Sequence, residues 1–255
     1  MRPMTDQTSA AQPASPPLPD SDWALFLDID GTLLDIAETP DRVVVPAALR
    51  RDLAAAAAAL GGALALVSGR ALGNIDGLFD PLRLPASGQH GGEWRPAADA
   101  APEILVAPLP QALRDLADGL AARHAGLIVE HKSRALAVHY RHAPQLGPEI
   151  GSLLGAQLEG REGLMLMPGR LVWEIKDATQ SKGTAVSRFM GAPAFAGRRP
   201  VFVGDDRTDE DGFRAAERHG GFALPVGPLA QPGQPGFRDA GAVRQWLADF
   251  ARAAA

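Results

Sequence analysis

The sequence predicts an α/β protein with a Rossmann-like parallel-sheet core that is interrupted by an inserted α+β domain. Strand-like apolar runs alternate with helical stretches near both ends of the chain, which is typical of a parallel sheet. Polar residues follow several of these apolar runs directly. In the middle, from about residue 107 to 176, the pattern changes to helices that alternate with paired strands. The core is therefore split in sequence by a smaller domain.

The first expected core element is the run ALFLDIDGTLLD at 24–35. It is apolar until it reaches Asp28 and Asp30, and Gly31 and Thr32 follow directly. The ends of strands in open α/β sheets usually face the crevice where ligands bind. A polar strand end that runs into an Asp-Gly turn is the alternative, and this run alone does not exclude it.

A strand, a helix and a second strand make up the first third of the chain. Pro46 opens the helical stretch at 47–60, Gly61 and Gly62 end it, and the apolar run ALALVSGR at 63–70 follows. Such a unit requires a parallel pair joined by a right-handed crossover. Ser68 then falls at the same rim of the sheet as Asp28.

The second half of the core has the same alternation near the C-terminus. Its expected elements are a helix at 181–190, a strand at 201–204 that runs into DDRTDED, a strand at 221–227 and a helix at 242–253. These elements bring Lys182 and Asp205 to the rim that carries Asp28.

The inserted domain is expected to contain two helices and two hairpins. Tight connections are predicted at KSR (132–134) and PGR (168–170). The predicted organisation is a disordered tail over 1–22, core residues 23–106, the inserted domain at 107–176, and core residues 177–255.

Composition narrows the possible functions. The chain has 255 residues, no cysteine and a formal net charge of −5. Disulfides, thiolate catalysis and cysteine-based metal sites are excluded, and the charge speaks against nucleic acid or an acidic membrane as partner. Residues 1–22 lack the apolar region of a signal peptide, and no later window is long enough for a membrane span, so we expect a cytoplasmic protein.

The polar residues at the strand ends meet the separate needs of phosphoryl transfer. Asp28 is the candidate nucleophile, and Asp30 is the candidate acid and base. Asp205 would help to hold a Mg²⁺ ion that neutralises the phosphate. Ser68 and Lys182 would hold the phosphoryl oxygens, although Ser68 as a turn cap and Lys182 as a solvated lysine stay open as alternatives. Asp206 and the acids at 209–211 also suit a helix N-terminus.

Four short motifs, in this order, resemble the phosphatases of the haloacid dehalogenase superfamily. They are DIDGT (28–32), VSGR (67–70), SKG (181–183) and GDDRTDED (204–211). The resemblance implies Mg²⁺ as cofactor, bound by Asp28, the backbone carbonyl of Asp30, and Asp205. Lys182 lies 114 positions after Ser68, which leaves room for a lid between them, and this placement resembles the C2 cap class that closes over phosphorylated sugars.

Three further segments are GQHGGEWR (88–95), VEHKSRALAVHYR (129–141) and PGRLVWEIK (168–176). Together with GDDRTDED they resemble the trehalose-6-phosphate phosphatases. The resemblance implies that five residues bind the sugar: His90, Gly91, Glu130, Lys132 and Glu174. For His90, a hydrogen bond within its own loop is the alternative. Arg70, next to Ser68, would help to bind the anion or would fix the loop. Strand alternation would put Glu130 and Lys132 on one face, where a cross-strand ion pair is the alternative to sugar binding.

The expected activity is Mg²⁺-dependent hydrolysis of trehalose 6-phosphate through a phosphorylated Asp28. A phosphatase or mutase for another sugar phosphate, such as sucrose 6-phosphate, stays open, as does a non-catalytic sensor or regulatory subunit. We expect a monomer whose partner is a small-molecule sugar phosphate, with neither nucleic acid nor a membrane as partner.

Overall fold

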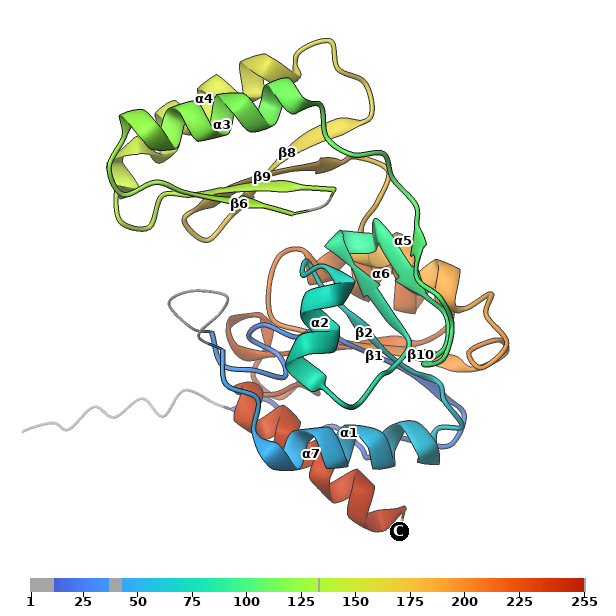
Figure 1. Ribbon diagram of the computed structural model, residues 1–255. Helices are drawn as coiled ribbons and strands as arrows, with labels where there is room; N and C mark the ends of the chain where they lie inside the picture. Colours follow the sequence, from blue (N-terminus) through green and yellow to red (C-terminus); the bar gives the residue numbers. More distant parts are fainter. Residues whose placement is uncertain (1–11, 37–42, 133, 255) are drawn as a thin grey trace, which may run out of the picture. The chain divides into compact units, whose positions relative to one another are not determined.

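The computed structural model describes residues 12–36, 43–132 and 134–254. The chain divides into two compact units (Figure 1). Unit 1 comprises Met1–Leu66 and Val186–Ala255, and unit 2 comprises Val67–Ala185.

Unit 1 is built on parallel strands in the order β11-β10-β1-β2. Every residue of β1 is buried, as a strand covered on both faces requires. The predicted α/β class is therefore confirmed. The strands are β1 (Trp23–Leu27), β2 (Leu64–Val67), β10 (Arg199–Gly204) and β11 (Phe222–Pro225).

Helices cover both faces of these strands. α1 (Ala47–Ala59) and α7 (Ala240–Ala253) lie side by side, and α6 (Asp209–Arg218) packs against β10 and β11 (Figure 1). Pro46 directly precedes α1, as predicted, and the Asp239 side chain caps α7 by accepting from the Ala242 N–H at 2.8 Å.

Aromatic side chains fill the core on both sides of β1. Phe26 stacks on Phe195 with ring centroids 5.5 Å apart, and Phe189 at the end of α5 (Lys182–Phe189) completes this group. On the other side, Trp23 meets Trp246 of α7. Alternation of side chains along β1 therefore anchors two helical layers.

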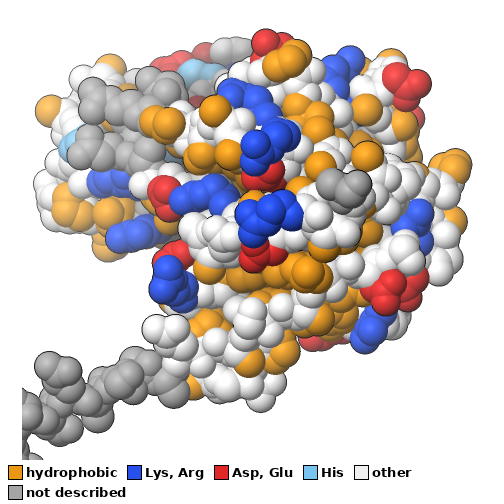
Figure 2. Space-filling view, turned by 90° about the horizontal axis from the view of Figure 1, so that it is seen from below, with side chains coloured by type: hydrophobic (Ala, Val, Ile, Leu, Met, Phe, Trp, Pro, Cys, Tyr) orange, Lys and Arg blue, Asp and Glu red, His pale blue; other side chains and the backbone are white. Residues whose placement is uncertain are grey.

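The face of unit 1 that carries α1 and α7 has mixed charge. Basic and acidic side chains lie among apolar ones (Figure 2). Arg51 pairs with Asp52 at 2.9 Å and Arg244 pairs with Asp35 at 3.2 Å. This arrangement differs from the basic stripe of a nucleic-acid-binding face.

The predicted N-terminal tail lies partly outside the described residues, because the description begins at residue 12. Within residues 12–22, the Ala14 N–H donates to Gln234 at 2.8 Å. The Pro17 carbonyl accepts a hydrogen bond of 2.9 Å from the Trp246 indole. This segment thus makes specific contacts that the prediction of a tail did not include.

Unit 2 contains a four-stranded antiparallel sheet in the order β6-β7-β9-β8. Two helices cover one face of it (Figure 1), and Leu136, Val138 and Ile175 form the buried centre with apolar residues of these helices. The two predicted hairpins and helices are all present, and we call these six elements the lid. They are α3 (Gln111–Arg123), β6 (Ile128–His131), β7 (Leu136–His139), α4 (Gly147–Leu158), β8 (Leu164–Gly169) and β9 (Val172–Asp177).

The rest of unit 2 consists of short elements that the sequence pattern did not reveal. Buried Arg95 holds them together, because its guanidinium binds both carboxylate oxygens of Asp76 at 2.7 Å and also the Leu84 carbonyl. The elements are α2 (Leu72–Phe79), β3 (Ala86–Gly88), β4 (Glu93–Arg95) and β5 (Glu103–Ile104). Single turns of 3₁₀ helix occur at Gln89–Gly91, Pro144–Leu146 and Gly227–Leu229.

Within the described residues, none of the helices combines the length and the apolar character that a membrane crossing requires. The predicted boundaries of the lid at residues 107 and 176 stay a prediction.

Candidate active site

Three carboxylates gather in unit 1 at the ends of neighbouring elements. Asp28 follows β1, Asp205 follows β10, and Asp209 begins α6. One oxygen of each lies within 4.8 Å of the other two, and Asp28 and Asp209 are buried. We call this group the carboxylate cluster.

Two glycines make the cluster possible. Gly31 has a φ of +87°, and a Cβ on it would lie 2.1 Å from a carboxylate oxygen of Asp205. A Cβ on Gly204 would lie 2.3 Å from the carboxyl carbon of Asp209. Any other residue at these two positions would push the carboxylates out of place.

Hydrogen bonds fix the orientation of the cluster. One oxygen of Asp209 accepts from the N–H groups of both Asp205 and Asp206 at 3.0 Å. The Thr32 hydroxyl donates to Asp205 at 3.1 Å. The acids are therefore held close together although like charges repel.

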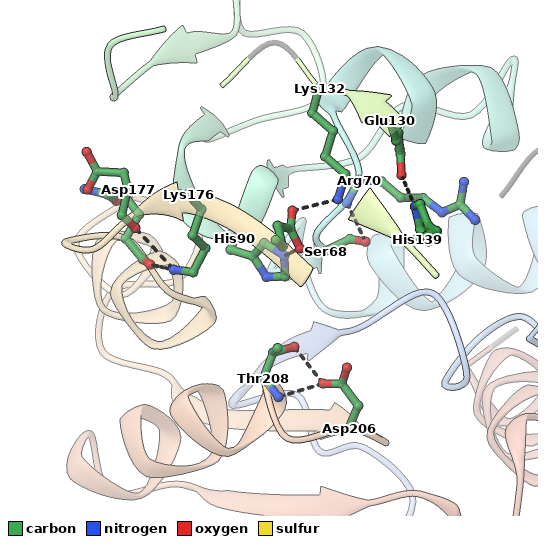
Figure 3. A network of polar contacts seen from close by, with 12 residues as sticks. Ser68, Arg70, His90, Glu130, Lys132, His139, Lys176, Asp177, Asp206 and Thr208 are labelled. Carbon is green, nitrogen blue, oxygen red and sulfur yellow. Dashed lines mark hydrogen bonds and ion pairs between the residues drawn. The ribbon is translucent and has the colours of Figure 1, made fainter. Parts of the chain in front are cut away.

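The other acids near the start of α6 have different roles. The Asp206 carboxylate accepts from the N–H and the hydroxyl of Thr208, at 2.7 and 2.6 Å, in a turn before the helix (Figure 3). Glu210 and Asp211 pair with Arg214 at the surface. The helix-terminus interpretation fits Glu210 and Asp211, whereas Asp209 belongs to the cluster.

The cluster fits a hard divalent cation. Its donors are carboxylate oxygens, which Mg²⁺ prefers, and a cation would offset the repulsion among three buried or half-buried acids. The predicted ligands Asp28 and Asp205 are both present in it. Asp30 contributes no side-chain oxygen to the cluster, and the resemblance implied only its backbone carbonyl. The sequence prediction did not include Asp209 among the ligands.

Ser68 and Arg70 lie in unit 2, beside a strained turn. The Ser68 hydroxyl accepts from the Arg70 N–H at 3.2 Å, and the Ser68 carbonyl accepts from the His90 N–H at 3.1 Å. Gln89 and His90 both have positive φ values, 47° and 54°. Such strain costs about 1–3 kcal/mol per residue and persists only where the surroundings enforce it, often at functional sites.

Lys182 begins α5 and is buried. The helix start is fixed by reciprocal hydrogen bonds, because the Ser181 N–H donates to the Thr184 hydroxyl and the Thr184 N–H donates to Ser181. Gly91, with a φ of +103°, lies against Ser181, where a Cβ would approach the Ser181 carbonyl to 2.8 Å. Burial makes the solvated-lysine alternative for Lys182 untenable.

Two buried residues, His90 and Glu174, and the half-buried Lys132 form an ionic group that we call the lid network. Figure 3 labels His90 and Lys132. The Lys132 ammonium lies 2.7 Å from one oxygen of Glu174, and the His90 ring lies 3.2 Å from the other. Burial opposes ionisation of Glu174, but Lys132 and His90 outweigh it and hold its pKa well below the usual range. Burial also opposes the charge on Lys132, yet Glu174 and Glu130 raise its pKa above the ordinary value.

Glu130 takes part in a second pair on the lid. Its carboxylate lies 3.1 Å from the His139 ring, diagonally across the β6–β7 pair (Figure 3). The hydrogen bond from His139 outweighs partial burial and lowers the pKa of Glu130, with help from Lys132. Glu130 and Glu174 both lie opposite Ala137 in the sheet register, so the two carboxylates flank a small side chain on one face. The cross-strand pair that the sequence left open as an alternative therefore exists for Glu130, whereas Lys132 pairs with the buried carboxylate of Glu174.

Comparison with known proteins identifies the family. The family model described as Trehalose-phosphatase matches residues 26–234. The chain belongs to the trehalose-phosphatase family. The predicted family and enzyme class are confirmed. A probable trehalose-phosphate phosphatase of Sinorhizobium fredii (strain NBRC 101917 / NGR234) is 44% identical over 207 residues, which are 81% of this chain and 78% of that protein.

A second member of the trehalose-phosphatase family, the trehalose-6-phosphate phosphatase of Escherichia coli K12, is 40% identical over 88% of this chain and 84% of its own length. Among solved structures, the C-terminal domain of trehalose-6-phosphate phosphatase from C. albicans has a TM-score of 0.76. It is 20% identical, and the match covers 91% of this chain and 92% of that one. That likeness supports the fold of the core and lid.

Proposed function

We propose that this member of the trehalose-phosphatase family hydrolyses trehalose 6-phosphate to trehalose and phosphate in a Mg²⁺-dependent reaction. The observation that carries the proposal is the carboxylate cluster, which offers three oxygens to one cation and includes the candidate nucleophile Asp28. Close relatives named as trehalose-phosphate phosphatases support the choice of substrate.

The proposed chemistry has two steps. In the first, an Asp28 oxygen attacks phosphorus, the bond between phosphorus and the sugar oxygen breaks, and Asp30 donates a proton to the leaving sugar. In the second, Asp30 takes a proton from a water molecule, which attacks the phosphorylated Asp28 and releases phosphate. Mg²⁺, held by Asp28, Asp205 and Asp209 together with the Asp30 carbonyl, would neutralise charge on the phosphoryl oxygens.

Residues of unit 2 would hold the substrate in this proposal. Ser68 and Lys182 bind the phosphoryl oxygens, and Arg70 assists in binding the anion. Because the lid network is already neutralised internally, it can recognise uncharged hydroxyls by hydrogen bonding. The sugar-binding residues are Glu130, Lys132 and Glu174 of the lid, together with His90 and Gly91.

The test is phosphate release by the purified protein across a panel of sugar phosphates, with Mg²⁺ present and after removal of metal by EDTA. We expect trehalose 6-phosphate to give the highest kcat/KM, and EDTA to abolish turnover until Mg²⁺ is restored. A higher kcat/KM for sucrose 6-phosphate or for a monosaccharide phosphate would disprove the trehalose assignment. Full activity in EDTA would disprove the metal requirement.

We also propose that the lid extends from residue 107 to residue 176, and that the protein is a cytoplasmic monomer.

A further inference from the structure

Gln89 occupies an unusual position in unit 2. It is buried in the strained turn, and its main-chain N–H donates to the Arg70 carbonyl at 2.8 Å. Its side chain binds two groups that belong to different segments. The amide nitrogen donates to a Glu93 oxygen, and the amide oxygen accepts from the Arg134 main-chain N–H at 2.7 Å.

The Gln89 side chain thus bridges Glu93 and the main chain of Arg134, and both of these partners are themselves held in place. The second oxygen of Glu93 accepts from the Leu72 N–H at 2.6 Å, in the first turn of α2, where the N-cap residue Ala71 has no side chain that could do so. Glu93 is therefore fixed by a helix start as well as by β4. At the other end, Arg134 lies in the turn between β6 and β7, which the Lys132 N–H closes by donating to the Ala135 carbonyl at 3.1 Å.

Two adjacent residues, Gln89 and His90, are both linked to the β6–β7 hairpin, Gln89 through the bridge and His90 through the lid network. His90 binds Glu174, which binds the Lys132 side chain, and Gln89 binds the main chain of the turn that begins at Lys132. We propose that Gln89 is a positioning residue, whose amide holds this turn so that Lys132 and Glu174 keep the geometry that recognises the sugar. This inference rests on the proposed function, because it assumes that Lys132 and Glu174 meet the sugar.

The chemistry of the bridge requires an amide. The Arg134 N–H only donates, and the Glu93 carboxylate only accepts. The side chain between them must therefore accept at one atom and donate at another. Methionine has a similar length but cannot donate and accepts only weakly, so Gln89→Met removes the bridge while it keeps most of the volume.

The experiment compares two substrates. Trehalose 6-phosphate, or whichever sugar phosphate the panel identifies, depends on the lid, whereas p-nitrophenyl phosphate needs only the phosphate site. For Gln89→Met we expect kcat/KM on the sugar phosphate to fall about 10- to 100-fold, chiefly through KM, and turnover of p-nitrophenyl phosphate to stay within about 2-fold. Gln111→Met makes the same change at an exposed amide on α3 and should alter neither.

A second pair of variants tests the same bridge from the other side. Arg134→Pro removes the main-chain donor, whereas Arg134→Ala keeps it. Relative to Arg134→Ala, we expect Arg134→Pro to lower kcat/KM on the sugar phosphate as much as Gln89→Met does. The double variant Gln89→Met/Arg134→Pro should lower kcat/KM no further than either single substitution. This pair also decides the question if Gln89→Met does not fold.

The inference is overturned if Gln89→Met lowers kcat/KM equally for both substrates or changes it for neither. It is also overturned if the effects of Gln89→Met and Arg134→Pro on kcat/KM add in the double variant. Failure of the proposed function looks different, because the unaltered protein would then prefer another sugar phosphate to trehalose 6-phosphate or would show no preference among sugar phosphates.

Discussion

The carboxylate cluster of unit 1 and the lid network of unit 2 solve opposite electrostatic problems. In the cluster, three acids crowd together, and the fold holds them there with main-chain N–H donors and with glycines that leave room. In the lid network, one buried carboxylate is shared between a lysine and a histidine. A cluster of like negative charges attracts a cation, whereas a carboxylate that is already paired with a lysine can hydrogen-bond to uncharged hydroxyls. The first region therefore suits the reaction, and the second suits recognition of the substrate.

Asp28→Asn should have the largest effect. The amide cannot attack phosphorus, so kcat for the preferred sugar phosphate should fall by about 10⁴-fold or more. Phosphate release by the purified variant measures this. Asp35→Asn, at an exposed acid of the same unit, is the matched control and should retain full activity. Turnover above about 1% of the unaltered rate would contradict a nucleophilic Asp28.

Asp209→Asn tests whether the cluster binds metal. Asparagine keeps an oxygen that can accept from the Asp205 and Asp206 N–H groups, but it removes one negative charge. The Mg²⁺ concentration for half-maximal activity should therefore rise about 10- to 100-fold. Asp211→Asn changes an exposed acid in the same helical turn and should leave this concentration unaltered. An unchanged Mg²⁺ requirement in Asp209→Asn would remove this residue from the metal site.

Asp209 also shows where sequence reasoning reached its limit. The sequence predicts Asp28 and Asp205 as ligands because each follows an apolar run, and parallel strands bring such ends together. Asp209 lies four residues beyond the strand among acids that are typical of a helix start. Asp209 differs from Glu210 because its carboxylate occupies the space beside Gly204, which has no side chain. This proximity depends on the folded structure and cannot be read from the sequence.

The lid offers a similar contrast. Its helices and hairpins are regular enough for the sequence to predict their number and order, whereas α2 and β3 to β5 are too short to show a period. Alternation along the strand predicts which face of the sheet carries Glu130. The pairing of Lys132 with Glu174 depends on a turn past the end of β6 and on the β7–β9 register, and neither is encoded locally. The sequence does not indicate a role for Gln89 for the same reason, since both of its side-chain partners are set by tertiary contacts.

Lys132→Met should lower stability, because it leaves the Glu174 carboxylate buried with only His90 beside it. We expect a loss of about 3–5 kcal/mol at pH 7 by urea unfolding. The pKa of Glu174 is depressed in the folded protein, so its contribution is present above the unfolded value of about 4.3 and is lost as pH falls below it. The pKa of Lys132 is raised, so its share is lost only at alkaline pH.

The difference in free energy of unfolding between the unaltered protein and Lys132→Met should therefore be largest between about pH 5 and 10. It should decrease by about 1–2 kcal/mol at pH 3. Lys132→Met/Glu174→Gln removes both charges and should recover most of the loss at pH 7. If the double variant were no more stable than Lys132→Met, the ion pair would not be the source of the effect.

His139→Phe should have the smallest effect, because Glu130 and His139 are both partly exposed. Phenylalanine keeps a ring but offers no hydrogen bond, so the pKa of Glu130 rises toward its ordinary value. Glu130 stays ionised at pH 7, where KM for the sugar phosphate should change by only about 2- to 5-fold. Under acidic conditions, however, kcat/KM of the variant should begin to fall at a higher pH than that of the unaltered protein. A pH profile measured on p-nitrophenyl phosphate should show no such displacement, because that substrate has no sugar for Glu130 to bind. An equal displacement on both substrates would mean that His139 acts on the reaction and not on the lid.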